Sequence, residues 1–360
     1  MKNFCYSYND LIAISNLFQA WSEFRKGKSK RFDVQNFERR LEDNLFNLQR
    51  SLKNKTYRHG KYQSFYVNDP KQRHIHKACV SDRIIHHLLY NYLYEIFDRT
   101  FIFDSFSCRL GKGTHRGVLR LATFARKISK NYTRSCFALK LDIKKFFASV
   151  DHKVLLNLLK KKIKDEDILW LIEQIIDSFH SKSAGVSLAR RGLASSNRGI
   201  PLGNLTSQIF ANIYLNELDQ FVKHKLKVKY YLRYADDFIV LDSDRSNCNQ
   251  YTSILAQFLK DRLKLQLHPK KIMIRKLNWG IDFLDYIVLS YYILPRTKTK
   301  RRIFKKLEEK TGSSNFNQSL QSYLGYLKHA NTHELTQELK NQVCGSGKIN
   351  SIKLLTLHNF

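Results

Sequence analysis

The sequence predicts an α+β fold, built from a sheet domain with helical appendages. Stretches with apolar residues at helical spacing alternate with short apolar runs that are typical of strands. Long connections join these runs, and no internal repeat is apparent. From Pro295 onward the chain is basic and helical, with few strand signals. This order of elements favours a mixed sheet domain that carries additional helices.

Each element is predicted from its local pattern. Helical periodicity predicts helices, whereas alternation or apolar β-type runs predict strands. The expected helices cover residues 9–26, 37–52, 81–97, 153–180, 207–226 and 250–265, and more follow 295. The expected strands lie within 61–80, 137–150 (with a break at Lys144-Lys145), 230–241, 271–276 and 283–293. Residues 181–198 are rich in Ser, Gly and Arg, which predicts a loop or a poorly packed hairpin.

The charge balance indicates a polyanionic partner. Lys and Arg total 63 against 31 Asp and Glu, so the net charge is 63 − 31 = +32. A globular chain tolerates such self-repulsion mainly beside a polyanion, with nucleic acid the stronger interpretation and an anionic membrane the weaker. No apolar run has the length of a membrane span, and the N-terminus lacks a signal-peptide pattern. The six cysteines show no paired spacing. We therefore expect a cytoplasmic protein with no membrane partner.

The tetrapeptide Tyr234-Ala235-Asp236-Asp237 places two adjacent acids inside an apolar run. A desolvated carboxylate must be paired or bind metal, so a buried strand does not tolerate it without a partner. A tight hairpin turn resolves the conflict, because the acids then project from the tip while the flanking strands stay buried. Adjacent carboxylates repel one another, and a site that keeps both ionised usually holds a divalent cation.

Asp142 is a lone acid in the apolar run Leu139-Lys140-Leu141-Asp142-Ile143. Taken alone, Asp142 is more readily interpreted as a strand-end residue that caps a helix. Together with Asp236 and Asp237 it completes the carboxylate set that a two-metal phosphoryl-transfer site requires.

Several sequence blocks resemble the motifs of bacterial reverse transcriptases in the correct order. Residues 141–152 (LDIKKFFASVDH) resemble motif A, residues 199–208 (GIPLGNLTSQ) motif B, and YADD motif C. Further blocks resemble the fingers segment (69–73 and 82–84), the block after it (106–113), motif D (267–271) and the primer grip (Phe283-Leu284-Asp285-Tyr286). Ordered agreement of this many blocks is specific. It implies an RNA-directed DNA polymerase of the group II intron-like type.

The resemblance implies a right-hand polymerase with fingers, a palm of antiparallel sheet plus helices, and a small helical thumb. The implied domains are an N-terminal helical extension (1–60), fingers (61–135), palm (136–290, with insertions at about 153–200) and thumb (291–360). After Tyr286, 360 − 286 = 74 residues remain, enough for a thumb but not for an RNase H, protease, integrase or endonuclease domain.

The resemblance also implies roles for the acids. Asp142 and Asp236 would ligate two Mg²⁺ ions, for which Mn²⁺ could substitute, together with the backbone carbonyl of Ile143. Asp237 would tune the local field and contact a metal less directly. The primer-grip residues Phe283 to Tyr286 would lie against the primer strand.

Deoxynucleotide binding is assigned by position in the same motifs. Lys71 and Arg73 would clamp the triphosphate, unless they are only a solvated basic strand. Phe147 would lie under the sugar and exclude a 2′-hydroxyl, unless it is a core residue as Phe146 beside it is expected to be. Lys271 would protonate the pyrophosphate leaving group, and Lys270 is an equally available alternative. The motif B residues complete this set: Pro201, Leu202 and Gly203.

Leu202 departs from the Gln that many reverse transcriptases have in motif B. An aliphatic residue there, followed by Ser207-Gln208, resembles the reverse transcriptases of diversity-generating retroelements. That subgroup copies a template-repeat RNA with errors at template adenines, beside a small basic pentameric accessory protein. The alternatives are a structural Leu with ordinary fidelity, a phage-defence or intron-related enzyme, and a non-catalytic RNA-binding scaffold. RNA template, DNA or RNA primer and dNTPs are the expected partners.

Overall fold

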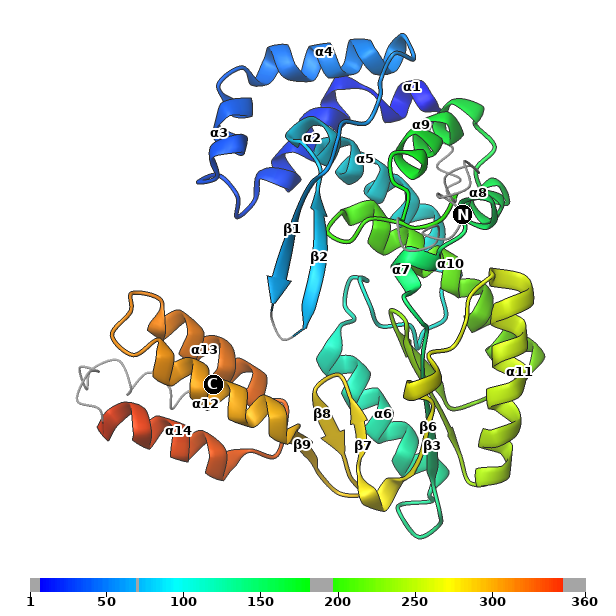
Figure 1. Ribbon diagram of the computed structural model, residues 1–360, viewed down its shortest axis with the longest axis vertical. Helices are drawn as coiled ribbons and strands as arrows, with labels where there is room; N and C mark the ends of the chain where they lie inside the picture. Colours follow the sequence, from blue (N-terminus) through cyan, green and yellow to red (C-terminus); the bar gives the residue numbers. More distant parts are fainter. Residues whose placement is uncertain (1–6, 69–70, 182–196, 346–360) are drawn as a thin grey trace, which may run out of the picture. The chain divides into compact units, whose positions relative to one another are not determined.

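The computed structural model describes residues 7–68, 71–181 and 197–345, so most of the loop expected at 181–198 lies outside the described residues. The helices are α1 (Tyr8–Leu11), α2 (Ile14–Arg25), α3 (Phe32–Glu38), α4 (Leu41–Lys53), α5 (Val80–Phe97), α6 (Thr114–Ile128), α7 (Phe146–Ser149), α8 (His152–Lys160), α9 (Glu166–Asp177), α10 (Leu205–Gln220), α11 (Arg245–Leu263), α12 (Thr297–Glu309), α13 (Phe316–Leu327) and α14 (His333–Gly345). The strands are β1 (Gln63–Asn68), β2 (Gln72–Lys77), β3 (Phe137–Asp142), β4 (Tyr231–Tyr234), β5 (Asp237–Asp242), β6 (Met273–Lys276), β7 (Ile281–Phe283), β8 (Tyr286–Val288) and β9 (Ile293–Pro295) (Figure 1).

The strands form three sheets, and each pairing for which a register is given is antiparallel. β1 and β2 form a hairpin in which Gln63 pairs with Lys77 and Asn68 with Gln72. A four-stranded sheet has the order β4-β5-β3-β6, with β3 and β6 antiparallel. A three-stranded antiparallel sheet has the order β7-β8-β9. Together with the helices, these sheets confirm the predicted α+β class, with antiparallel sheet and helices as in a right-hand polymerase.

The described chain divides into two compact units. The first comprises residues 1–112, 141–238 and 250–272, and the second comprises 113–140, 239–249 and 273–360. In the first unit α5 packs against α2 and α10, and α8 against α10. The helix α5 has ten buried residues along its length, which explains its central position in this unit. All three predicted metal-site carboxylates belong to the first unit.

The second unit contains the β7-β8-β9 sheet, which packs against α6 through β8. It also contains α12, α13 and α14, drawn in orange and red in Figure 1. These three helices enclose a cluster of buried aliphatic side chains that includes Ile303, Leu320 and Leu339. The cluster gives this end of the chain a core of its own, as helices with one apolar face require.

Two predicted helices are each divided in the structure. The helix expected at 9–26 is interrupted after Leu11, and Ser7 forms a capping box with Asp10 at the start of the short α1. The helix expected at 153–180 becomes α8 and α9, because the Asp165 side chain accepts hydrogen bonds from two N–H groups in the first turn of α9. Apolar periodicity continues across both breaks, so the periodicity alone does not reveal where a cap restarts the helix.

Within the described residues, no helix combines the length and the apolar character that a membrane span needs.

Candidate active site

The tight turn predicted for the adjacent acids is confirmed. β4 ends at Tyr234 and β5 begins at Asp237, so Ala235 and Asp236 form the turn between them. Ala235 has a φ of 51°, the left-handed conformation that a two-residue hairpin turn demands. Tyr234 and Asp237 next to the turn are partly exposed, and the strand residues beyond them, 231–233 and 238–241, are buried. The turn therefore presents two carboxylates from the end of a buried hairpin.

Asp142 ends β3, and it is 8% exposed. Its carbonyl accepts a hydrogen bond from the N–H of His268 (2.8 Å), and the N–H of Lys144 donates to the carbonyl of Gln266 (2.9 Å). Successive residues of an extended segment direct their backbone groups to opposite sides. The carbonyl of Ile143 therefore faces away from residues 266–268, as a metal ligand beside Asp142 would require.

The electrostatics of the acids favour a cation. Burial, together with the negative charges of Asp237 and Asp142, raises the pKa of Asp236 to about 6. The like charges that raise this pKa would be relieved by a bound divalent ion. Three carboxylates and a carbonyl are oxygen ligands of the type that Mg²⁺ prefers, so their chemistry fits the ion.

The carboxylates are not already gathered as a ligand cluster. Among the residues that the structure describes, no group of three or more His, Cys, Asp or Glu side chains is arranged to hold a metal. One of the three acids, Asp142, is instead paired with a lysine, since its Oδ2 lies 2.7 Å from the Nζ of Lys271. The ammonium group provides the positive charge at this carboxylate.

That contact distinguishes Lys271 from Lys270, which the sequence alone leaves as equivalent candidates. Lys271 is in hydrogen-bonding distance of Asp142, with its side chain 44% exposed. Lys270 is exposed, and its backbone N–H donates to Nδ1 of His268. The geometry thus favours Lys271 as the cation of the site.

Phe147 lies in α7, within motif A, and is partly exposed, whereas Phe146 is 2% exposed in the core as expected. The two rings meet edge to face with centroids 5.3 Å apart. The carbonyl of Phe147 accepts a hydrogen bond from the N–H of Ile200 (2.7 Å), and that of Val150 accepts from Gly199 (2.7 Å). These bonds fasten the start of motif B beside Phe147.

The motif B loop is also attached to the β1–β2 hairpin. The N–H of His76 donates to the carbonyl of Leu202 (2.8 Å). Gly203 has a φ of 115°, and a Cβ there would come within 2.8 Å of Ile75. Pro201 is buried and Leu202 is half-buried. The predicted fidelity residue is therefore held between α7 and β2, both in the first unit.

Lys71 and Arg73 lie on the same hairpin and are exposed. Arg73 pairs with Val67 across the strands, and Lys71 precedes β2. Within the described part of the chain neither has an acidic partner. Both cations are thus available to an anionic ligand, although no contact joins them to the carboxylates. Residues 69 and 70 of the predicted fingers block lie outside the described residues.

The predicted primer grip is in the second unit. Phe283 and Tyr286 are fully buried at the ends of β7 and β8, and Leu284 and Asp285 form the turn, with φ of 51° and 68°. The hydroxyl of Tyr286 donates to the carbonyl of Tyr326 (2.8 Å), whose own hydroxyl donates to the carbonyl of Asp285 (2.8 Å). The two aromatic residues of the block are core residues, so Leu284 and Asp285 are the ones accessible to a strand.

The sequence analysis missed Arg233, which has no exposed surface. Its guanidinium forms an ion pair with the equally buried Asp219 of α10 (2.7 Å) and donates to the carbonyl of Ala235 (3.0 Å). Burial disfavours its charge, but Asp219 more than offsets this and holds the pKa of Arg233 above its ordinary value. A signal was present, because an arginine inside a buried strand must have a partner. The partner itself could not be found without the fold.

The analysis also missed His86 of α5. Its Nδ1 lies 2.7 Å from Oγ1 of Thr206, in the first turn of α10, and its Nε2 lies 3.2 Å from that of His59. Burial, together with the neighbouring His59, His87 and Arg83, lowers the pKa of His86 to about 3. A neutral imidazole therefore contacts the first turn of the helix that begins within motif B.

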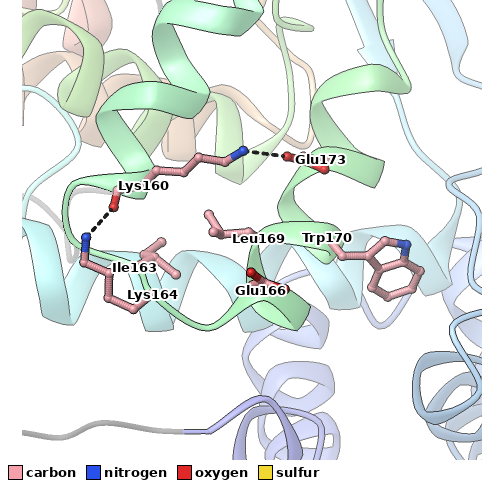
Figure 2. A pocket seen from close by; sticks show the side chains of 7 residues that line it. All are labelled: Lys160, Ile163, Lys164, Glu166, Leu169, Trp170 and Glu173. Carbon is pink, nitrogen blue, oxygen red and sulfur yellow. Dashed lines mark hydrogen bonds and ion pairs between the residues drawn. The ribbon is translucent and has the colours of Figure 1, made fainter.

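A surface pocket of about 400 Å³ lies between α8 and α9 (Figure 2). It is lined by Lys160, Ile163, Lys164, Glu166, Leu169, Trp170 and Glu173. Lys160 faces Glu173 at 3.4 Å, and Lys164 donates to the carbonyl of Lys160. None of the predicted site residues lines this pocket, and its lysines already have partners, so it is not the candidate active site.

Comparison with known proteins gives relatives of one kind. The Group II intron-encoded protein LtrA of Lactococcus lactis is 23% identical over 310 residues, covering 68% of this chain and 49% of LtrA. The Putative COX1/OXI3 intron 2 protein of Saccharomyces cerevisiae is 24% identical over 233 residues, covering 49% of this chain and 26% of that protein. The chain thus spans half or less of the length of these two relatives.

The telomerase of Candida albicans, solved with a fragment of telomeric RNA, is similar at a TM-score of 0.48 and 12% identity, covering 77% of this chain and 56% of that one. Residues 66–326 match the family described as reverse transcriptase (RNA-dependent DNA polymerase), and they include every predicted site residue. The chain belongs to the reverse transcriptase family.

Proposed function

We propose that this chain is an RNA-directed DNA polymerase that makes cDNA from a retroelement template-repeat RNA by two-metal nucleotidyl transfer. The carrying observation is the set of three acids, in which Asp142 is buried and Asp236 and Asp237 are partly buried. Burial raises the pKa of Asp236 to about 6, and the like charges of Asp237 and Asp142 contribute to this rise. Acids that repel one another in a partly desolvated site are costly to folding, and a role in binding cations explains their presence. The division into extension (1–60), fingers (61–135), palm (136–290) and thumb (291–360) belongs to this proposal.

In this mechanism Asp142, Asp236 and the carbonyl of Ile143 hold the metal ions, with Asp237 acting through its charge. When bound, the ions supply Lewis-acid stabilisation of the charge on the transferring phosphoryl group. Lys271 begins beside Asp142, at 2.7 Å, and serves as the proton donor to pyrophosphate. Lys71 and Arg73 bind the triphosphate, since both are exposed cations without acidic partners among the described residues.

Phe147 excludes ribonucleotides. Its ring is partly exposed, and its carbonyl is bonded to the residue that precedes Pro201. A rigid ring fixed in this way clashes with a 2′-hydroxyl on a sugar stacked against it. The product is therefore DNA.

The test is extension of a DNA primer on an RNA template with dNTPs and Mg²⁺. The intact chain should extend the primer, and Asp236→Ala should abolish extension while leaving salt-sensitive RNA binding in place. Extension that survives Asp236→Ala would overturn the assignment. RNA binding without any extension by the intact chain would instead support the non-catalytic scaffold.

We further propose error-prone copying at template adenines, as in diversity-generating retroelements. The supporting observation is Leu202, an apolar residue whose carbonyl is bonded to His76 of β2, at a position where an amide side chain would constrain the nascent pair. Leu202→Gln should lower misincorporation opposite adenine while extension continues. An unchanged error spectrum would place any infidelity elsewhere in the protein. A small basic pentameric protein is the expected accessory partner.

An intron-related role is the second candidate, because the names of the matched relatives include a group II intron-encoded protein and a nuclear intron maturase. The two candidates differ in template. Extension that requires a template-repeat RNA favours the first, and extension that requires intron RNA favours the second.

A further inference from the structure

Arg233 satisfies every donor of its side chain inside the protein. Nε donates to both oxygens of Asp219, at 2.8 and 3.0 Å. Nη2 donates to Asp219 Oδ2 (2.7 Å) and to Ser105 Oγ (3.1 Å). Nη1 donates to Asn212 Oδ1 (3.3 Å) and to the carbonyl of Ala235 (3.0 Å). A guanidinium has five N–H groups, and each one here has an acceptor.

These contacts join three segments of the first unit. Asn212 and Asp219 come from α10, the helix that begins within motif B. Ser105 belongs to a loop whose backbone pairs with Arg233 itself, since the N–H of Arg233 donates to Asp104 and its carbonyl accepts from Phe106, both at 2.9 Å. The third segment is the acidic turn. Hydrogen bonds to α10 and to the Ser105 loop therefore fix the guanidinium that donates to the carbonyl of Ala235.

The bond to Ala235 acts on the geometry of Asp236. The carbonyl of Ala235 and the N–H of Asp236 belong to one planar peptide unit. A hydrogen bond that fixes the carbonyl therefore fixes the plane from which the Asp236 side chain departs. Ala235 has a φ of 51°, a left-handed conformation that is unfavourable for an alanine and needs support from its surroundings.

Stability alone does not account for this arrangement. Arg233 and Asp219 are both fully buried, and the cost of desolvating a buried ion pair often equals or exceeds its attraction. Apolar residues of similar volume would fold as well or better. A polar network that is complete and that ends on the catalytic turn is consistent with a role in function.

We propose that Arg233 is a positioning residue that orients Asp236 through the Ala235 carbonyl, with Asp219 holding the guanidinium in place. This inference rests on the proposed function, because it assigns Arg233 to the geometry of that same site. Neither residue touches nucleotide or metal. Their effect is on the rate of the chemical step and not on the binding of dNTP.

Two variants separate positioning from folding. Arg233→Lys keeps a positive charge for Asp219 but lacks the fork that reaches Ala235. The triple variant Arg233→Met, Asp219→Leu, Tyr231→Phe removes the whole pair, and Tyr231 is included because its hydroxyl donates to Asp219 (2.6 Å). Lys160→Met with Glu173→Leu is the matched control, since it removes an ion pair from the surface pocket.

In primer extension, Arg233→Lys and the triple variant should each lose kcat by about 100-fold, the effect of an ångström-scale misplacement, with KM for dNTP nearly unchanged. The control should keep both parameters. Wild-type kcat in Arg233→Lys and in the triple variant would overturn the proposal. A rise in KM with kcat unchanged would also overturn it, because the pair would then act on nucleotide binding.

Hydrogen exchange supplies a readout that does not depend on activity. In Arg233→Lys, amides at residues 234–238 should exchange faster than in the wild type, while those of α9 keep their protection. Uniformly faster exchange would mean a merely structural role and would overturn the proposal, as would unchanged exchange at the turn. Absence of extension by the wild type would overturn the proposed function alone, and the exchange result would still decide the role of Arg233.

Discussion

The acidic turn (residues 235–236) and the motif B loop (residues 199–204) both belong to the first unit. Their buried polar side chains differ in hydrogen bonding: those beside the turn have partners, and within the described residues that of the loop does not. At the turn, every donor of Arg233 has an acceptor. At the loop, Asn204 is 3% exposed, and neither atom of its amide has a hydrogen-bond partner within the described residues. The same holds for Nδ1 of His76, whose backbone N–H contacts Leu202.

The difference matches the two tasks of a template-directed polymerase. Catalysis requires carboxylates at fixed positions, and a complete polar network provides them. Selection requires groups that respond to the incoming pair, and a buried polar group without a protein partner costs about 1–3 kcal/mol until a ligand satisfies it. Asn204 of the loop and His76 beside it carry such groups, so we expect chemistry and selection to be separable by mutation.

The largest expected effect is at the carboxylates. Asp142→Asn removes one ligand and the charge that pairs with Lys271. Several kcal/mol of transition-state stabilisation correspond to a loss of extension rate on the order of 10³-fold. Single-turnover extension measures it, with the exposed Asp43→Asn as control. A tenfold loss or less would show that Asp142 is not a metal ligand.

An effect of intermediate size on the free energy of unfolding is expected at His86. The sign of its pH dependence follows from the lowered pKa of this residue. Its pKa falls from 6.5 to about 3 on folding, so between these pH values the imidazole is protonated in the unfolded chain and neutral in the folded chain. Its contribution is complete above pH 6.5 and is lost as the pH falls from 6.5 towards 3. His86→Gln can keep a bond to Thr206 but carries no proton.

Denaturant unfolding between pH 6.5 and 4 should therefore be less steep in pH for His86→Gln, by at most about 1.4 kcal/mol per pH unit. His224→Gln, at an exposed position, should follow the wild type. An identical slope in all three proteins would mean that His86 is accessible to solvent protons.

The smallest expected effect is at Asn204 and tests the comparison itself. Asn204→Leu removes a buried amide without a partner, so the free energy of unfolding should rise by about 1–2 kcal/mol. Asn212→Leu is the matched control, because the Asn212 amide donates to Ser107 (2.9 Å) and accepts from Arg233, and its loss should destabilise. Thermal or denaturant unfolding distinguishes them. Destabilisation of equal size in both would remove the contrast between the loop and the turn.

The sequence predicted local features of the site well, because a short segment carries its own physical demands. The hairpin at Asp236 follows from acids inside an apolar run, and the break after Asp142 follows from the lysines behind it. Phe146 in the core and Phe147 partly exposed also agree with the structure. In each case neighbouring residues alone determine the environment.

The features that could not be predicted from the sequence are contacts between segments that are distant along the chain. Asp219 and Arg233 are 14 positions apart, and Ser105 is 128 positions from Arg233. Such contacts depend on how helices and strands pack, and no spacing rule gives them. The same reason applies to Lys271, which is distinguished from Lys270 only by its contact with a residue 129 positions away.

The most direct measurement of the central claim is single-nucleotide incorporation on an RNA template, with correct and incorrect dNTPs opposite adenine. Arg233→Lys should slow both insertions by the same factor and leave their ratio unchanged, whereas Leu202→Gln should lower the share of incorrect insertions at a nearly unchanged correct rate. If Arg233→Lys changes the ratio, or if Leu202→Gln slows both insertions equally, chemistry and selection are not divided between the turn and the loop.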